Sequence, residues 1–542
     1  MCSRCPLALA LSVAVLALPL APPLAAPSPG AERASSRPDE WWKGAVFYQV
    51  FVRSFADSDG DGVGDLAGLT DHLDYLNDGD PATHDDLGVD AILLMPVFAS
   101  PSYHGYDVTD YERIASAYGD LDSFSKLVQA AHRRGLKVIL DLPLNHTSDE
   151  HPWFKDSASG RASRRRGWYE WSPKDPGWGK PWDLSSKAWH RRGKDFYYGL
   201  FEAGMPDLNY QNQEVREEMK RIIRLWLGRG ADGFRLDAVR FLVETGPVRG
   251  QVSTPLTHAY LKELSQAVRA EKPGAVLVGE VWSVTEDIAD YYGNGSDELD
   301  LAFDFPLAAA IVSAAANGRT DELSSVLAAA RRAYPPGAVD APFLTNHDQI
   351  RIATRVQNDP ARLRLAAALL FTLPGSPFVY QGEELGEENG DGQADEEKRT
   401  PLPFRCEGAG HGFTNGTPWH AFAKGAEQRC VERERADPTS LLSFYRDLIA
   451  LRHASPALLR GDLEPVGLPG APHSALAFLR KSEAEVVLCI HNAGPEPLDT
   501  GPLELPATSA EPLLPGSPPL EAVAGGLRAV LPPLSSGAWR LF

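Results

Sequence analysis

The chain has 542 residues, which is long for a single hydrophobic core and predicts two or three domains. Hydrophobic residues make up 43% and charged residues 23%, as in soluble globular proteins. The formal net charge of -20 argues against nucleic acid as a partner, because a surface that binds phosphates must be basic.

The N-terminal residues have the composition of a secretory signal peptide. Arg4 is the only early charge, residues 7–18 are almost wholly apolar, and Ala25 and Ala26 offer a small-residue cleavage site. We therefore expect a signal peptide over residues 1–26, a linker over 27–40 and a secreted or periplasmic protein. No other stretch approaches the roughly 20 apolar residues of a membrane span, so no membrane span is expected.

Short β-rich runs then alternate with helical stretches through residues 41–145 and 213–455. The predicted strands are residues 45–52, 91–96, 137–142, 233–237, 276–280, 301–305, 343–346 and 378–380. The stretches with apolar residues at helical spacing include 122–134, 214–229, 257–271 and 362–373. Eight strands separated by helices predict an α/β fold, a (β/α)8 TIM barrel, whose active site lies at the C-terminal ends of the strands.

The connection after the third strand is too long for a simple loop. Residues 146–212 contain no clear helix, and they hold six of the 12 Trp residues. Loops of this length in a compact barrel are usually functional, so we expect an inserted domain over the active face. Its aromatic side chains either stack on sugar rings or form the core of the insert.

The C-terminal part changes character after a helix over residues 440–453 that closes the barrel. Residues 456–542 are rich in Pro and Gly and contain short β-runs, which predicts an antiparallel β-sandwich domain. Three cysteines follow the predicted signal. Cys406 and Cys430 flank a Gly-rich loop and could pair, whereas Cys489 lies in an apolar run and is expected to be a buried thiol.

The acidic loop over residues 57–65 reads DSDGDGVGD and is a candidate metal site. Asp57, Asp59 and Asp61 alternate, Asp65 follows, and the glycines permit a tight turn. Oxygen ligands at this spacing suit calcium. The twelfth position is Gly68 rather than Glu, so the loop is not an EF-hand, and the alternative is an acidic turn without metal.

Three acidic residues lie at the ends of predicted strands. A glycosidase needs two carboxylates facing one sugar bond, and the candidates are Asp237 and Glu280, with Asp348 as a third acid. Arg235 is on the same side of its strand as Asp237, so it can reach that carboxylate or a neighbour and keep it ionised. Two apolar residues follow Glu280, which favours the raised pKa that a general acid requires.

Five motifs at these strand ends together resemble those of the α-amylase family of glycoside hydrolases, family 13. They are DLPLNH (141–146), MPDLN (205–209), GFRLDAVR (233–240), GEVW (279–282) and TNHD (345–348). The resemblance covers nearly all of the chain after the predicted signal. It implies that Asp237 is the nucleophile of a retaining reaction through a covalent glycosyl-enzyme, with Glu280 as acid/base and Asp348 as transition-state stabiliser.

The resemblance also implies a set of side chains that contact the sugar in and beside the cleavage subsite. Tyr106 matches the family's stacking tyrosine, and His104 lies in the same segment. The expected substrate-binding residues are His104, Tyr106, Asp141, His146, Arg235, Arg240, Trp282 and His347. The implied ligand is an α-glucan such as starch or maltooligosaccharides. The sequence gives no oligomeric state.

Two details of the resemblance concern metal ions. The acidic loop is similar to the calcium loop of the oligo-1,6-glucosidase-like branch, in which the Val63 carbonyl would bind Ca2+ beside the carboxylates of Asp57, Asp59, Asp61 and Asp65. Many α-amylases hold a second calcium with an Asn and a His. Here Asn145 is present, but Phe241 stands at the histidine position, which argues against that second site.

The motifs mix features of two branches, and this leaves the specificity open. MPDLN lies between the patterns of oligo-1,6-glucosidase-like and neopullulanase-like enzymes. Ala238 is small where α-1,6-specific relatives tend to have Val, so we expect α-1,4 bonds to be preferred. The leading hypothesis is a secreted α-amylase. The alternatives are an exo-acting α-glucosidase or oligo-1,6-glucosidase, a neopullulanase or cyclomaltodextrinase, and a 4-α-glucanotransferase. A non-catalytic binding homologue is disfavoured because all three acids are present.

Overall fold

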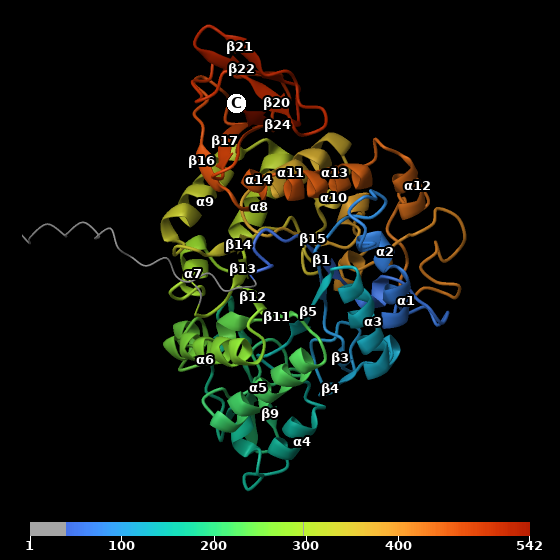
Figure 1. Ribbon diagram of the computed structural model, residues 1–542. Coiled ribbons are helices and arrows are strands. Elements are labelled where there is room, and N and C mark those ends of the chain that lie inside the picture. Colours follow the sequence, from blue (N-terminus) through green and yellow to red (C-terminus); the bar gives the residue numbers. More distant parts are fainter. Residues whose placement is uncertain (1–39, 296) are drawn as a thin grey trace, which may run out of the picture. The chain divides into compact units, whose positions relative to one another are not determined.

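The computed structural model describes residues 40–295 and 297–542, and the predicted signal peptide lies outside them. Eight parallel strands form the central barrel, in the order β14-β13-β12-β11-β5-β2-β1-β15 (Figure 1). A single parallel bridge between Phe343 and Phe378 joins the two ends of this sheet, so the barrel is nearly closed. The strands are β1 (Phe47–Val50), β2 (Ala91–Leu94), β5 (Lys137–Leu142), β11 (Gly233–Leu236), β12 (Val276–Gly279), β13 (Leu301–Phe303), β14 (Val339–Ala341) and β15 (Phe378–Tyr380).

The seventh strand differs from the prediction. It was expected over residues 343–346, but β14 ends at Ala341, where it pairs with Phe303 of β13. The reason is Pro342, which has no backbone N–H and so cannot continue the ladder. Beyond it the chain contributes only the bridge at Phe343, and the TNHD motif lies in the loop that follows.

The interior of the barrel is apolar at one end and polar at the other. Phe47, Ile139 and Leu301 belong to a cluster of buried side chains at the starts of the strands. Successive inward positions are two residues apart, so Gln49 follows Phe47 and Asp141 follows Ile139 on the same face. The strands therefore direct their polar side chains to their C-terminal ends.

Helices outside the strands complete the barrel (Figure 1). Several begin with a side-chain cap, such as Asp120 before α3 and Asn212 before α5, which satisfies backbone N–H groups that the helix leaves free. The main helices are α3 (Leu121–Arg133), α5 (Gln213–Gly228), α6 (Pro255–Glu271), α8 (Phe305–Asn317), α9 (Thr320–Ala333), α11 (Pro360–Thr372) and α13 (Leu441–Ala454). Shorter helices are α1 (Leu66–Asp71), α2 (Leu73–Leu76), α7 (Thr285–Asp290), α10 (Ile352–Arg355), α12 (Val431–Ala436) and α14 (Pro456–Arg460).

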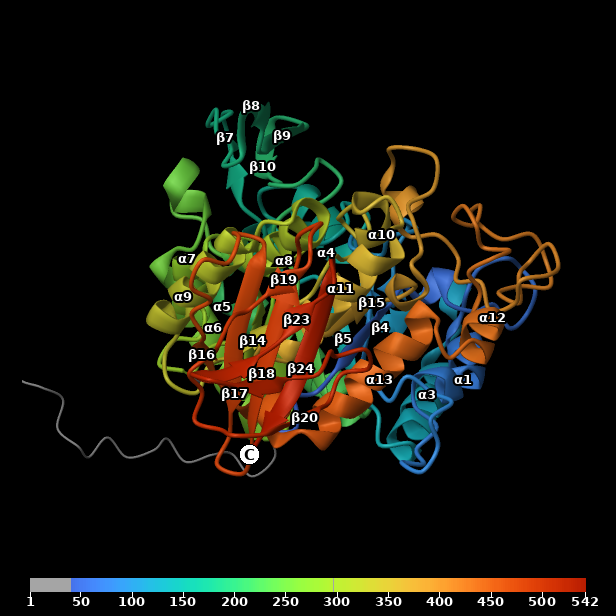
Figure 2. The same cartoon turned by 90° about the horizontal axis from the view of Figure 1, so that it is seen from above.

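The long connection after β5 forms its own small elements, and its strands β7 to β10 stand out at one edge of the molecule in Figure 2. They are α4 (Pro152–Ala158), β6 (Trp171–Ser172), β7 (Gly179–Lys180), β8 (Asp183–Lys187), β9 (Trp189–Arg192) and β10 (Asp195–Tyr198). The expectation that this stretch has no helix was wrong, because Pro152 opens α4 and His151 caps it. Five of its six Trp pack in hydrophobic clusters, and Trp182 is 53% exposed. Before β5, β3 (Phe98–Ala99) pairs with β4 (Asp110–Ile114).

The C-terminal part is an antiparallel sheet of five strands in the order β16-β17-β18-β24-β20, with smaller two-stranded sheets beside it (Figure 2). Alternate residues of β18 face different cores: Leu488 and Ile490 join the sandwich interior, while Val487 and Cys489 pack in the main core of the chain. The strands are β16 (Asp462–Pro465), β17 (Ala475–Lys481), β18 (Val486–Asn492), β19 (Leu498–Asp499), β20 (Ala510–Pro512), β21 (Glu521–Val523), β22 (Gly526–Arg528), β23 (Val530–Leu531) and β24 (Ser535–Leu541).

Two buried arginines cap the end of α11, and one of them, Arg480, connects this sheet to the barrel. The last carbonyl groups of an α-helix have no partner within the helix. At the end of α11, Arg480 of β17 donates to the Thr372 carbonyl (2.6 Å), and Arg452 of α13 donates to the Phe371 carbonyl (2.8 Å). Both side chains are fully buried, so they cap α11 within the protein interior.

The cysteines take the states considered from the sequence. Cys406 and Cys430 form a disulfide, and Cys489 is a buried free thiol. Among the described residues, no helix combines the length and apolar character needed to cross a membrane.

Candidate active site

One guanidinium organises the acidic side chains at the ends of the strands. Arg235 of β11 is buried, and its Nη1 lies 2.8 Å from Asp141 Oδ1 and 2.6 Å from Asp237 Oδ1. Its Nη2 lies 3.1 Å from Glu280 Oε2. Because neighbouring strands β5, β11 and β12 end at the same edge of the barrel, three carboxylates meet around one cation. The predicted pair of acids is thus brought together.

Glu280 directly follows β12 and also accepts a hydrogen bond from the Ala238 amide (3.0 Å). Ala238 has a φ of 52°, a left-handed backbone conformation that turns its N–H toward the carboxylate. Burial raises the pKa of Glu280 to about 7, against the opposing effect of Arg235. This agrees with the expectation of a raised pKa.

Arg235 contacts Asp237, as the sequence predicted, and acts to keep it ionised. Burial raises the pKa of Asp237 to about 6, because loss of solvent outweighs the effect of the guanidinium and Asp141 adds a repelling charge. The pKa of Asp237 still lies below that of Glu280. At a pH between these two pKa values, Asp237 is ionised while Glu280 holds a proton.

Asp348 lies in the loop after β14, with its side chain 35% exposed. Burial of the carboxylate acts to raise its pKa, but His347 and Arg399 lower it below the usual value. Since burial also lowers the pKa of His347 to about 3, the ring is neutral at neutral pH and Arg399 supplies the positive charge there. Arg399 Nη2 donates to Asp348 Oδ1 (2.9 Å).

A hydrogen-bonded row of rings lines the other side of Asp141. The Gln49 amide donates from its Nε2 to His347 Nδ1 (3.0 Å), so the neutral His347 ring has its proton on its own Nε2. His347 Nε2 is 2.7 Å from Tyr106 Oη, and Tyr106 in turn donates to Asp141 Oδ2 (2.8 Å). The Tyr106 ring stacks with the rings of His347 and His104, at centroid distances of 5.6 and 6.1 Å.

His146 is buried beside Phe201, at a centroid distance of 5.4 Å. Within the described chain, its ring nitrogens form no hydrogen bond of good geometry, and the Tyr106 backbone interacts with the ring. Burial lowers the pKa of His146 to about 4, so the ring is neutral. A buried polar ring of this kind costs stability unless a ligand or solvent completes it.

Arg240 and Trp282 lie away from the three carboxylates. Arg240 donates to the Trp282 carbonyl and lies 4.0 Å from Asp287. The Trp282 ring is 51% exposed and stacks on Phe305 at 4.4 Å. These two predicted residues therefore form a rim beyond Glu280 and do not join the group around Arg235.

Two residues in this site were not predicted from the sequence. Arg399 holds Asp348 and also donates to the His347 carbonyl (3.1 Å). Gln49 fixes the tautomer of His347. A signal for Gln49 was present, since a polar residue in the apolar run FYQV is unusual. Arg399 lies in a charged loop after β15 and had no such signal.

The acidic loop brings three of its predicted metal ligands together. Carboxylate oxygens of Asp57, Asp59 and Asp61 lie within 4.8 Å of one another. Asp65 does not belong to this group in the structure: its carboxylate caps α1 through the Gly68 amide (2.8 Å) and accepts the Ser58 amide (2.8 Å). The Asp57 carboxylate accepts the Gly60 and Gly62 amides, which closes the loop into a compact turn.

At the position expected for a second calcium, the structure shows hydrogen bonding and aromatic packing. Asn145 Nδ2 donates to Asp207 Oδ2 (2.9 Å). Phe241 packs against Phe201 and Trp182, at centroid distances of 5.7 and 5.5 Å. An apolar ring therefore takes the place of a histidine ligand, as the sequence indicated.

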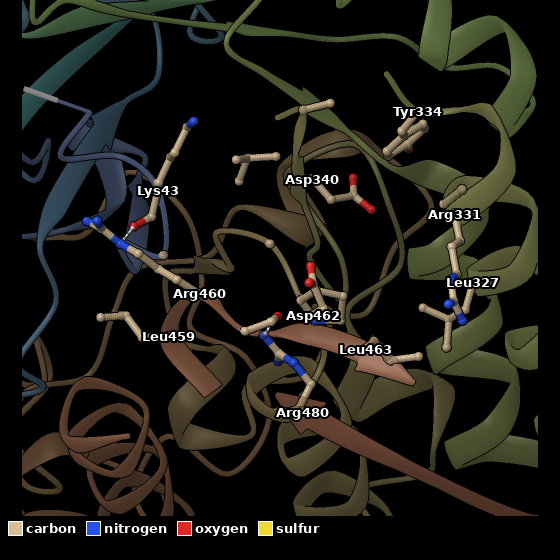
Figure 3. Close-up of a pocket in the computed structure, with 17 residues that line it drawn as sticks. Lys43, Leu327, Arg331, Tyr334, Asp340, Leu459, Arg460, Asp462, Leu463 and Arg480 are labelled. Atoms are coloured by element: carbon tan, nitrogen blue, oxygen red, sulfur yellow. Dashed lines mark hydrogen bonds between the residues drawn. The ribbon is translucent and has the colours of Figure 1, made fainter. Parts of the chain in front are cut away.

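A cavity of about 540 Å³ lies at the opposite ends of the strands, where Lys43 precedes β1 and Gly375 precedes β15 (Figure 3). Arg331, Asp340 and Asp462 are among the side chains that line it. None of the predicted site residues lines this cavity. We therefore assign the candidate active site from the chemistry of the side chains at the strand ends, and not from the presence of a cavity.

The chain was compared with known proteins. Residues 49–461 match the family model for the α-amylase catalytic domain. The chain is 38% identical over 463 residues to α-amylase 3 of Dictyoglomus thermophilum, which covers 84% of this chain and 85% of that protein. It is 30% identical over 535 residues to probable oligo-1,6-glucosidase 2 of Bacillus subtilis, covering 84% and 91%. The crystal structure of α-amylase from H. orenii superposes with a TM-score of 0.83 at 36% identity, covering 92% of this chain and all of that one.

Proposed function

Because this chain belongs to the α-amylase family of glycoside hydrolases, family 13, we propose that it is a secreted, retaining α-amylase. Its substrates are starch and maltooligosaccharides, and it cleaves their α-1,4 bonds. The observation that carries the proposal is the contact of Asp237 and Glu280 with the single guanidinium of Arg235. Two acids around one cation, with different pKa values, are what two-step glycoside hydrolysis requires.

The proposed roles follow from these acidities. Asp237, the more acidic of the pair, attacks the anomeric carbon while protonated Glu280 gives its proton to the departing oxygen. Glu280 then takes a proton from water, which attacks the glycosyl-enzyme and releases Asp237. Asp348, held ionised by Arg399, stabilises the positive charge that develops on the sugar ring.

The remaining predicted residues would hold the sugar. Tyr106, whose hydroxyl contacts Asp141 and His347, would stack on a glucosyl unit in the cleavage subsite. His104 and His146 would donate to or accept from sugar hydroxyls. In domain terms, we propose a barrel over residues 41–145 and 213–455, an insert over 146–212 and a C-terminal domain over 456–542.

The acidic loop is proposed to bind Ca2+. The donor set fits, because three carboxylates converge and calcium prefers six to eight oxygen ligands. Asp57, Asp59 and Asp61 would supply carboxylate oxygens and Val63 its carbonyl. Asp65 would join only if its carboxylate gave up its hydrogen bonds to Ser58 and Gly68. The ion would stabilise the loop and take no part in the reaction.

Secretion is supported by the disulfide between Cys406 and Cys430, since disulfides persist in oxidising compartments. A preference for α-1,4 bonds is supported by the small side chain of Ala238 beside Asp237. The similarity to an oligo-1,6-glucosidase keeps exo-action and α-1,6 cleavage as the second candidate.

The product profile tests the proposal. We expect soluble starch to yield a spread of oligosaccharides on thin-layer chromatography. Glucose alone would indicate an exo-acting α-glucosidase, and longer products would indicate a glucanotransferase. Faster cleavage of isomaltose units than of maltose units would contradict the preference for α-1,4 bonds. No turnover of starch, maltotriose, pullulan or cyclodextrin would overturn the proposed activity.

A further inference from the structure

A buried glutamine lies directly behind one of the histidines of the site. Gln49 belongs to β1, is 6% exposed and lies in the sheet between Leu93 of β2 and Tyr380 of β15. Its position is therefore fixed by the barrel on both sides. A buried amide costs stability unless it is hydrogen-bonded. Gln49 Nε2 donates to His347 Nδ1 (3.0 Å), so the barrel places a donor against one nitrogen of that ring.

The other nitrogen of the ring identifies the same tautomer. His347 is buried, and burial lowers its pKa to about 3, so the neutral ring holds a single proton. Its Nε2 lies 3.2 Å from Asp348 Oδ2 and 2.7 Å from Tyr106 Oη. An ionised carboxylate can only accept, and Tyr106 already donates its proton to Asp141, so the ring proton is on Nε2. Nδ1 is then an acceptor, as the donation from Gln49 requires.

The two other protonation states of this ring would disturb the site. With its only proton on Nδ1, the ring would turn a lone pair toward the Asp348 carboxylate, and two acceptors would face each other without a proton between them. With protons on both nitrogens, an imidazolium would offset the negative charge of Asp348. That charge is the one that the proposed reaction uses to stabilise the sugar ring in the transition state.

The charged groups near His347 act on its pKa in both directions. Asp348 and Asp395 favour a protonated ring, whereas Arg399 and Arg235 oppose one. These charges change how readily the ring takes a proton. A donor in direct contact with Nδ1 also decides which nitrogen takes it, because the amide N–H would meet a second N–H if Nδ1 were protonated. Gln49 on one side and Asp348 on the other therefore select one tautomer.

We propose that Gln49 is a positioning residue for the reaction. Through His347 Nδ1 it keeps the ring uncharged and keeps the Nε2–H directed at Asp348 and Tyr106. The inference rests on the proposed function, and Gln49 acts through His347 and not on the sugar itself. Its contribution should be to kcat more than to KM, because Asp348 opposes a charge that develops only in the transition state.

Two substitutions test the polarity of this contact. Gln49→Met has a similar length and no N–H, so kcat for maltopentaose should fall about tenfold, and KM should change by less than about twofold. Gln49→Glu keeps the shape. Its introduced carboxyl can donate to Nδ1 while protonated, but once ionised it can only accept, and Nδ1 then takes a proton. The kcat of Gln49→Glu relative to the wild type should therefore fall about tenfold or more from pH 5 to pH 8, whereas the ratio for Gln49→Met should stay constant.

Nuclear magnetic resonance of isotope-labelled histidine reads the tautomer directly. In the wild type, the His347 signal, identified by its loss in His347→Asn, should show a proton on Nε2 alone. In Gln49→Glu at pH 8 it should show protons on both nitrogens. The matched control is Gln381→Met, because Gln381 is also buried and its side chain bonds the backbone of Phe51 and Ser54. This control should lower the Tm and leave kcat and the His347 signal unchanged.

The outcomes separate this inference from the proposed function. A wild-type kcat in Gln49→Met, or a rate ratio for Gln49→Glu that does not vary with pH, would overturn the positioning role while the proposed function stands. A wild-type protein that turns over no glucan would overturn the proposed function, and the labelled histidine would still report the tautomer.

Discussion

Two groups of acidic side chains in this protein each contain one buried arginine, but the surroundings of their carboxylates differ. The strand-end cluster places Asp141, Asp237 and Glu280 around Arg235. The buried cluster follows β15 and places Glu383, Glu384 and Glu387 near Arg351, whose Nη2 lies 3.2 Å from Glu387 Oε2.

In the buried cluster, protein hydroxyl groups bind the carboxylates. Tyr48 and Tyr75 donate to Glu384 Oε1 (2.7 and 2.5 Å), Tyr445 donates to Glu383 Oε1 (3.0 Å), and Thr400 donates to Glu387 Oε1 (2.7 Å). In the strand-end cluster, Asp237 and Glu280 keep part of their surface exposed. One oxygen of each of the three glutamates still has no hydrogen-bond partner among the described residues. The clusters therefore differ in the exposure of their carboxylates, and we expect that exposure, and not the number of acids around a cation, separates a reactive site from a structural one.

The strongest contrast is expected when one acid is changed in each cluster. Glu280→Gln should lower the rate of starch hydrolysis by about four orders of magnitude or more, because proton donation to the departing oxygen is lost. Asp237→Ala should have a similar effect. Both variants should keep the circular dichroism spectrum of the native protein. The matched change Glu383→Gln should retain near-normal turnover. Equal rates in Glu280→Gln and Glu383→Gln would remove the distinction between the clusters.

Removing the cation of the buried cluster should act on stability. Arg351→Met leaves the Glu387 carboxylate buried and unpaired, which should lower the free energy of unfolding by about 3–5 kcal/mol. Thermal unfolding followed by calorimetry measures this as a lower Tm. The double variant Arg351→Met, Glu387→Gln removes both charges and should recover part of the loss. A single variant as stable as the wild type would show that the pair carries no such role.

The acidities of the strand-end cluster predict a narrow, bell-shaped pH profile. Activity should rise as Asp237 ionises near pH 6 and fall as Glu280 loses its proton near pH 7. On the alkaline side kcat/KM should fall about tenfold per pH unit. Initial rates on maltopentaose from pH 4 to 10 give the profile. A constant rate between pH 7 and 9 would rule out Glu280 as the proton donor.

Chelation probes a third acidic group, the loop of Asp57, Asp59 and Asp61, which forms no ion pair with a basic side chain of residues 40–295 or 297–542. If calcium binds only the folded state, excess chelator should lower stability by about 2–3 kcal/mol, seen as a lower Tm. Asp59→Ala should lower the Tm without chelator and lose most of the response. Asp122→Ala, an exposed acid elsewhere, should keep it. An unchanged Tm of the wild type in chelator would contradict the calcium site.

The smallest effect is expected from the protonation of the buried cluster. Burial raises the pKa of Glu383 to about 8, so the folded state keeps a proton that the unfolded chain releases above its usual value of 4.5. Stability therefore falls as pH rises from about 4.5 to about 8. The glutamine side chain in Glu383→Gln is uncharged at every pH. At pH 9 this variant should therefore have a higher Tm than the wild type, with a free energy of unfolding about 1 kcal/mol or more higher. The same Tm difference at pH 5 and pH 9 would contradict this.

The sequence predicted the parts of the site that depend on strand register. Asp237, Glu280 and Arg235 follow from where apolar runs end, because alternate residues of parallel strands share a face. The seventh strand was predicted in the wrong place. Pro342 has no backbone N–H, and this ends a strand only where the ladder needs a donor at that position, which the sequence does not reveal. Arg399 could not be predicted, because its approach to Asp348 depends on the path of a loop 51 residues away in the chain.

The acidity of Asp237 shows a further limit. Sequence reasoning placed a cation beside this carboxylate and inferred that the cation keeps it ionised. The structure adds burial and a second acid, Asp141, on the same guanidinium, and both raise the pKa of Asp237. Such a balance depends on three-dimensional surroundings that spacing along the chain does not contain.

One of the two arginines that cap α11 gives the C-terminal sheet a role beyond its own fold. Arg480 comes from that sheet, yet its guanidinium binds the carbonyl of Thr372 inside the barrel wall. A truncated enzyme ending near residue 455 would lose that donor and expose the apolar side of α11. Shortening the protein in this way would thus weaken the catalytic half as well, and both halves should melt in one cooperative transition.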